Sequence, residues 1–184
     1  SLMEEVKKEV DKVVREIKEL VRKVEEDVKK VVKESRDKVD KVVKENKKVV
    51  EKIRDLARRR TDEDLLREAE DEVRKVHEEN KRIHKESEDT IREVEKKLKK
   101  VLDDIERLVK EVSDRAKRVL DDDRSDEIRK LIKEALDKLK EVLDEARDRL
   151  KKVKEELETV NREVEKLLRD VDREIEKVLK EVEK

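Results

Sequence analysis

Apolar residues recur at intervals of three or four positions through almost the whole chain. The first series begins with Val6, Val10, Val13 and Ile17 and continues in the same steps to Leu56. Steps of three and four place side chains on one face of an α-helix. At 100° per residue, these positions occupy an arc of about 140° around the helix axis. The periodicity therefore predicts a long amphipathic helix, and the same pattern returns twice further along the chain.

Two short charged segments interrupt this periodicity. The first covers residues 58–64, where we expect Thr61 to cap the next helix, and the second covers residues 121–127, where Ser125 takes that role. The aspartates at 121–123 are unfavourable at the negative end of a helix dipole, so we expect that end to be frayed or already in the loop. The predicted helices run over approximately 2–59, 62–121 and 126–184, each about 85–90 Å long.

The short breaks determine how these helices pack. Consecutive helices joined by short loops are antiparallel neighbours, and three equal apolar arcs can close on one another. We therefore expect an all-α fold, a single-chain antiparallel up-down-up three-helix bundle of helices of about 58 residues, forming one domain over residues 1–184. The mean apolar spacing stays near 3.6, so the helices should be nearly straight. Such a chain needs no partner, and we expect a monomer.

Composition narrows the possible functions. Charged residues make up 60% of the chain, yet 55 basic and 56 acidic residues leave a net charge of only −1. A balanced surface lacks the basic stripe that nucleic acids or anionic membranes require, and no apolar run approaches a membrane span. Gly, Pro, Cys, Trp, Tyr and Phe are all absent, which excludes disulfides, thiolate catalysis and cysteine-ligated zinc.

A few polar residues lie inside the apolar arcs, where valine would otherwise be expected. They are Ser35 and Asn46 in the first helix, His77, Asn80, His84 and Ser87 in the second, and Asn161 in the third. Up-down-up connectivity places Ser35 level with residues near 86 and 160, and Asn46 level with residues near 75. Polar residues that are distant in sequence should therefore gather in two adjacent layers.

A buried polar group costs about 1–3 kcal/mol when it has no partner, so clustering favours hydrogen-bond networks. We predict one network of Ser35, His84, Ser87 and Asn161 and a second of Asn46, His77 and Asn80. Their role would be to fix helix register, because a shifted bundle would leave these groups unpaired against valine. The alternative is that some of them lie at arc edges and bind water.

The histidines and hydroxyl groups give no pattern of a catalytic or metal site. His77 and His84 are two turns apart, about 10.5 Å along the axis, which is too far to chelate one ion together. Neither is preceded by the Glu-x-x-His spacing of di-metal bundles. There is no Gly-rich loop or nucleophile elbow, and a serine beside His84 would lack an oxyanion hole. We expect no metal, no cofactor and no enzymatic activity.

The balanced Lys/Glu faces, the valine-rich core without aromatics and the clustered polar layer resemble de novo designed helical bundles with interhelical hydrogen-bond networks. Natural long three-helix proteins, such as spectrin-like repeats, ordinarily carry core aromatics and some Gly or Pro. The resemblance covers the whole chain and implies a structural scaffold with no natural function or localisation, expressed in soluble form in the cytoplasm. It also implies that five of the polar layer residues serve as the network: Asn46, His77, Asn80, His84 and Ser87.

The alternative is an interaction module: one chain of a designed homo- or hetero-oligomer, switchable by pH through buried histidines. Burial of a neutral imidazole disfavours its charged form, so such a bundle would lose stability as the pH falls. Residues at the edges of the apolar arcs distinguish the scaffold from the interaction module. They should be buried within one chain in a monomeric scaffold and against another chain in an interaction module. These are Val14, Val32, Val43, His77, Ser113, Leu136 and Leu179.

Overall fold

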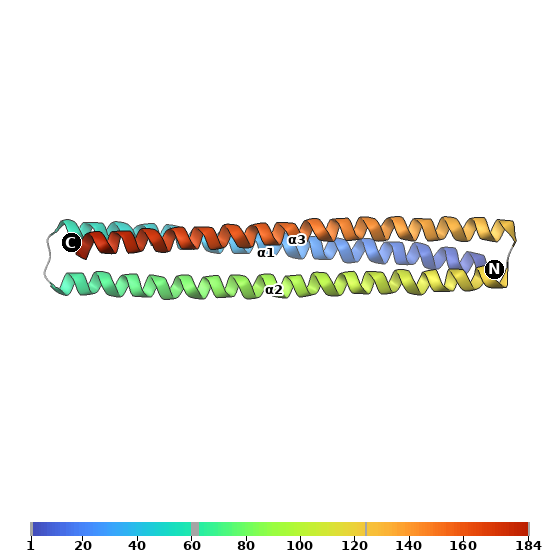
Figure 1. The fold of residues 1–184 in the computed structure, drawn as a ribbon, viewed down its shortest axis with the longest axis horizontal. Coiled ribbons are helices and arrows are strands. Elements are labelled where there is room, and N and C mark those ends of the chain that lie inside the picture. The colour runs from blue at the N-terminus through green and yellow to red at the C-terminus, as the bar shows by residue number, and fades with distance from the viewer. Residues whose placement is uncertain (1, 60–62, 124, 184) are drawn as a thin grey trace. The chain divides into compact units, whose positions relative to one another are not determined.

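The computed structural model of the chain describes residues 2–59, 63–123 and 125–183, and it contains three long α-helices (Figure 1). Helix α1 spans Leu2–Arg58 with 57 residues, α2 spans Glu63–Asp122 with 60, and α3 spans Asp126–Glu183 with 58. No strand occurs in the described part of the chain. The helices pack against one another, which confirms the all-α three-helix bundle predicted from the periodicity.

The second loop shows which local signals set the helix ends. Ser125 caps α3: its Oγ accepts a hydrogen bond from the Ile128 backbone N–H at 3.4 Å. Helix α2 continues to Asp122, one residue beyond the predicted end at 121, so Asp122 does not lie in the loop as expected. Asp123 closes the loop instead, since its carboxylate accepts a hydrogen bond from the Ser125 backbone N–H at 3.0 Å. The cap predicted at Thr61 lies outside the described residues.

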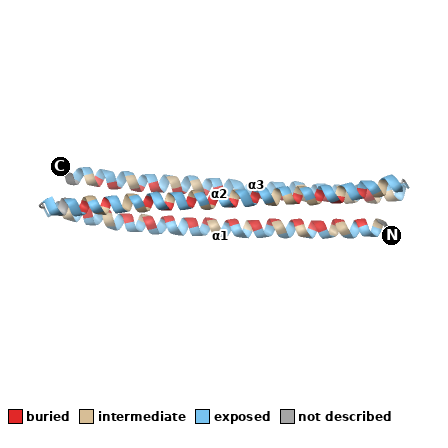
Figure 2. Cartoon of the chain, turned by 90° about the horizontal axis from the view of Figure 1, so that it is seen from below, coloured by how far each residue is buried: buried red, intermediate tan, exposed pale blue. Residues whose placement is uncertain are grey.

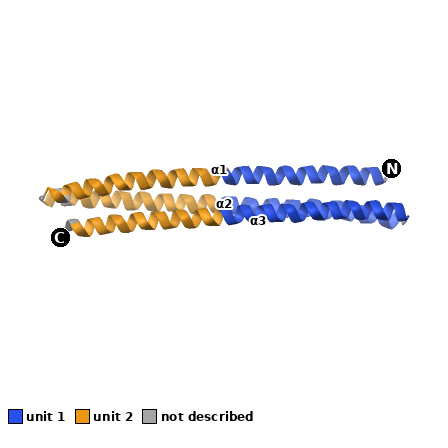
Figure 3. Cartoon of the chain, turned by 90° about the horizontal axis from the view of Figure 1, so that it is seen from above, with its two compact units in different colours: residues 1–29, 93–156 blue, residues 30–92, 157–184 orange. Residues whose placement is uncertain are grey.

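The chain divides into two compact units, each containing a segment of all three helices (Figure 3). Unit 1 comprises residues 1–29 and 93–156, and unit 2 comprises residues 30–92 and 157–184. In unit 1 an ion pair joins α1 to α3 between residues 127 apart in sequence, Asp11 and Lys138. In unit 2 Arg36 and Glu163 pair with the same separation. Unit 1 contains a second α1–α3 ion pair, Arg149 with Glu25, so both chain segments advance in the same direction and α1 runs parallel to α3 there. The single domain over residues 1–184 stays a prediction.

Buried residues recur along each helix in steps of three or four, and they are coloured red in Figure 2. In unit 1, Ile105 and Val28 are completely buried, and in unit 2 Ile53 and Ile175 are. The apolar residues of these cores are Val, Ile, Leu and Ala. In α2, Val109 is buried as well as Ile105. None of the described helices has a stretch long and apolar enough to cross a membrane.

The outer faces carry a repeated ion-pair motif. An arginine lies three residues after one glutamate and four residues before another, and its guanidinium bonds to both. Arg82 contacts Glu79 and also donates to Glu86 at 2.7 Å. Arg22 makes the same contacts with its two neighbouring glutamates. The hydrogen bond from Arg82 lowers the pKa of Glu79 below its ordinary value of 4.5. These pairs are exposed, and exposed pairs contribute little to stability.

Candidate functional site

All seven polar residues singled out in the sequence lie in unit 2. Four of them are buried, with exposed fractions of 3–8%, and the other three are partly buried. The buried four are Ser35, Asn46, Asn80 and Ser87, and the partly buried three are His77, His84 and Asn161. Among the described residues of unit 1, no polar side chain is buried. The buried residues of the described part of unit 1 are therefore all apolar, whereas those of unit 2 include four polar ones.

Asn46 joins helix α1 to helix α2 from inside the apolar arc of α1. Its side-chain Nδ2 donates to the Val42 backbone carbonyl at 2.7 Å, one turn earlier in the same helix. The same group also donates to Oδ1 of Asn80 at 3.3 Å. Both residues are at most 5% exposed, so water cannot readily replace these partners. The Oδ1 atom of Asn46 is buried without a hydrogen-bond partner.

The chain of hydrogen bonds continues from Asn80 to Asp172 on α3. Nδ2 of Asn80 donates to Oδ1 of Asp172 at 2.8 Å. Nδ1 of His77 lies 3.2 Å from the same oxygen, and it must be the donor because a carboxylate only accepts. The Asp172 side chain is 41% exposed, so its charge keeps contact with water. Asn46, Asn80 and Asp172 thus connect all three helices through side-chain hydrogen bonds.

Sequence reasoning placed Asn46, His77 and Asn80 in one layer but did not include Asp172. His77 reaches this group through Asp172 and makes no direct hydrogen bond to either asparagine among the described contacts. Up-down-up connectivity places Asn46 of the first helix level with a residue near 171 of the third. The position of Asp172 along the helix axis could therefore be predicted from the sequence. Its identity was not, because acidic residues are frequent along this helix and only the contact with Asn80 distinguishes this one.

The other predicted group has a different arrangement. Among the described residues, no hydrogen bond joins Ser35, His84, Ser87 and Asn161 to one another. Oδ1 of Asn161 is buried without a partner. The physical reason is the position of His84: its side chain is 39% exposed, so the ring lies at the edge of the core beside surface carboxylates. The expected contacts with the two serines are therefore absent from the described structure.

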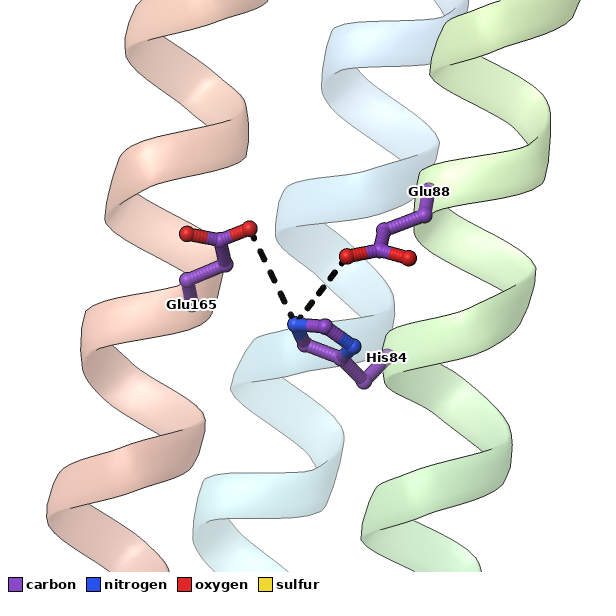
Figure 4. Close-up of side chains that lie close together, drawn as sticks. All are labelled: His84, Glu88 and Glu165. Atoms are coloured by element: carbon purple, nitrogen blue, oxygen red, sulfur yellow. Dashed lines mark ion pairs between the residues drawn. The ribbon is translucent and has the colours of Figure 1, made fainter.

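His84 lies between two glutamates from different helices, as Figure 4 shows. Its Nε2 is 3.6 Å from Oε1 of Glu88, one turn later on α2, and 3.9 Å from Oε1 of Glu165 on α3. The expectation of buried histidines is thus wrong for both rings, because the His77 side chain is also 29% exposed. Sequence reasoning missed both glutamates, although the His84–Glu88 spacing of four was visible.

Comparison with known proteins gives no family for this chain. No protein-family model matches it, and no curated protein does. Among solved structures it is similar to a protein described as a computationally designed three helix bundle, with 25% sequence identity over 98% of this chain and 86% of that chain, at a TM-score of 0.37. A TM-score this low gives no basis for transferring the fold or role of that protein to this chain.

Proposed function

We propose that this chain is a designed structural scaffold without enzymatic activity. We further propose that its hydrogen-bonded polar group fixes the register of the three helices. The observation that carries the second part is the chain of contacts from Asn46 through Asn80 to Asp172, which joins one residue from each helix. The absence of Gly, Pro, Cys and aromatic residues from the sequence supports the first part.

The physical basis of register selection is the cost of unpaired amides. Valine dominates the core around these residues, and a valine surface accepts a helix at several heights with similar contacts. A slip of α1 past α2 by about seven residues, or about 10.5 Å, would bring Asn46 against Val73 and Asn80 against Val39. Each buried amide would then lack its partner, at a cost of about 1–3 kcal/mol. The native register avoids this cost.

The experiment replaces both asparagines with valine and measures distances between helices. The chain has no cysteine, so two cysteines introduced at the exposed positions Lys47 and Lys81 can carry spin labels without other reactive thiols. We expect one narrow distance distribution in the parent and several distances in the Asn46→Val/Asn80→Val variant. The Asn161→Val variant, which removes an amide whose oxygen has no partner, is the matched control and should keep the narrow distribution.

A single narrow distance in the double variant, identical to that of the parent, would refute the role in register. It would mean that the shapes of the apolar side chains already select the helix heights.

The scaffold is proposed to act as a monomer rather than as one chain of an oligomer. Two of the arc-edge residues, Val14 and Val32, are buried within the chain. The other five, Val43, His77, Ser113, Leu136 and Leu179, are partly buried. Light scattering coupled to size-exclusion chromatography should give a mass near the 22.2 kDa of one chain at all concentrations. A larger, concentration-dependent mass would favour the interaction module.

A further inference from the structure

The three side chains at His84 have the spacing of metal ligands. Nε2 of His84, one carboxylate oxygen of Glu88 and one of Glu165 all lie within 4.8 Å of one another. The two distances from Nε2, 3.6 and 3.9 Å, are longer than hydrogen bonds. Figure 4 shows both carboxylates directed toward the same ring nitrogen. The three atoms therefore converge without being in direct hydrogen-bonded contact.

The two separations from Nε2 are close to those that a bound zinc ion requires, and the two carboxylate oxygens lie within 4.8 Å of each other. Zinc binds nitrogen and oxygen ligands at about 2.0–2.2 Å, so tetrahedral ligands lie about 3.3–3.5 Å apart. The two distances from Nε2 exceed that value by only a few tenths of an ångström, which rotation of the long glutamate side chains can supply. The other histidine differs, because Nδ1 of His77 is already within hydrogen-bond distance of Asp172.

The fold supports this arrangement in two ways. His84 and Glu88 are four residues apart on α2, which places them on the same face of one helix, while Glu165 comes from the neighbouring α3. Arg169 contacts the other oxygen of Glu165 at 3.5 Å, which leaves Oε1 directed toward the ring. A neutral imidazole and two carboxylates carry together two negative charges, which balance a divalent cation.

We propose that His84, Glu88 and Glu165 form a binding site for a divalent transition-metal ion, with zinc as the probe. The imidazole favours zinc, cobalt, nickel or copper over calcium and magnesium, which prefer all-oxygen sites. Three protein ligands leave a fourth position for water. The bound ion would link α2 to α3 in unit 2. This site departs from the expectation of no metal, which considered only a pair of histidines and the Glu-x-x-His spacing.

The chain contains only two histidines, and this makes a matched control available. Zinc titration followed by calorimetry should give one ion per chain for the parent and for His77→Ala. The His84→Ala and Glu165→Gln variants should each lose at least about tenfold in affinity, since even residues outside the first coordination sphere change affinity by 10–100-fold. Circular dichroism of each variant checks that the helices are retained.

Two further measurements report the site directly. Cobalt in place of zinc should give visible absorption of a four-coordinate ion, and this absorption should vanish in His84→Ala but not in His77→Ala. Free zinc at 100 times the dissociation constant should lower the unfolding equilibrium constant about 100-fold in denaturant titrations. Calcium at the same concentration should not change that constant.

Three results would overturn the proposal. The first is the absence of saturable zinc binding by the parent protein. The second is equal loss of affinity in His77→Ala and His84→Ala. The third is unchanged affinity in Glu165→Gln, which would mean that the ion is held by unrelated surface carboxylates. None of these results bears on helix register, so the failure of this site is distinguishable from failure of the proposed scaffold role.

Discussion

The contact between Asn46 and Asn80 can be tested by a double-mutant cycle in which each residue is changed to alanine, singly and together. The two side chains are almost completely buried, at 5% and 3% exposure. They are joined by one hydrogen bond of 3.3 Å. A cycle isolates the energy of that bond, because the bond is lost in each single variant but is counted only once in the double variant.

The magnitudes follow from the partners of each amide. Asn80→Ala removes the 3.3 Å bond and the 2.8 Å bond to Asp172. Bonds to charged groups contribute about 1.5–3 kcal/mol, and we take the lower limit because Asp172 is 41% exposed. The variant should therefore be about 2 kcal/mol less stable than the parent. Asn46→Ala should cost about 1 kcal/mol, and the double variant should cost about 0.5–1 kcal/mol less than the sum of both.

The assay is guanidinium unfolding followed by far-ultraviolet circular dichroism, with the free energy of unfolding compared at equal m values. A second cycle with Asn46→Ala and Asn161→Ala serves as the control, because no described hydrogen bond joins these residues. It should be additive within about 0.3 kcal/mol. The same additivity in the Asn46/Asn80 cycle would refute the reasoning, since a hydrogen bond that holds two helices together cannot have zero coupling energy.

Three further predictions concern other positions. Asn161→Leu removes a buried oxygen without a partner and should raise the free energy of unfolding by about 1 kcal/mol, seen as a higher denaturant midpoint. Ile105→Ala, at a completely buried position, should cost about 2–5 kcal/mol, while Leu167→Ala, at a position 40% exposed, should cost less than about 1 kcal/mol; equal costs would mean that another chain covers Leu167. Hydrogen bonds from arginines lower the pKa of Glu19 and Glu79 below 4.5, so their stabilisation is present above pH 4.5 and is lost as the pH falls through the lowered values. The Glu19→Gln/Glu79→Gln variant should show a smaller loss of stability between pH 7 and pH 3 than the parent, and an unchanged loss would contradict this.

The sequence was sufficient for the helices because one strong signal repeats over the whole chain. The apolar spacing of three and four residues predicted each helix end to within two residues of the observed one. For example, the first helix ends at Arg58 where residue 59 was predicted, and the second begins at Glu63 where residue 62 was predicted. The error at Asp122, one residue beyond the predicted end, came from giving the helix dipole too much weight. The dipole effect is worth about 0.3–1 kcal/mol for exposed groups, and the structure retains Asp122 in the helix.

The polar contacts were predictable only in part. The connectivity of the helices determines which residues lie level with one another, but it does not determine which of their side chains form hydrogen bonds. Connectivity alone put Asn46 near His77 and Asn80. The partners that complete each group are Asp172 and Glu165, and they are charged residues on a helix whose outer face is full of such residues. Periodicity cannot show which of many carboxylates turns toward a neighbouring helix. That choice depends on side-chain rotation and on the partner across the interface.

The concentration of polar residues in unit 2 is consistent with the proposed role in register. Helix α1 is continuous from Leu2 to Arg58, and a continuous helix cannot slide along its axis in one place without sliding everywhere. One polar group per helix is then enough to fix its height, and the described core of unit 1 contains none. Additional buried amides would add desolvation costs of about 1–3 kcal/mol for each unpaired group, as the unpaired oxygens of Asn46 and Asn161 already illustrate. The balance of these effects favours few polar groups in a long bundle, placed where all three helices can share them.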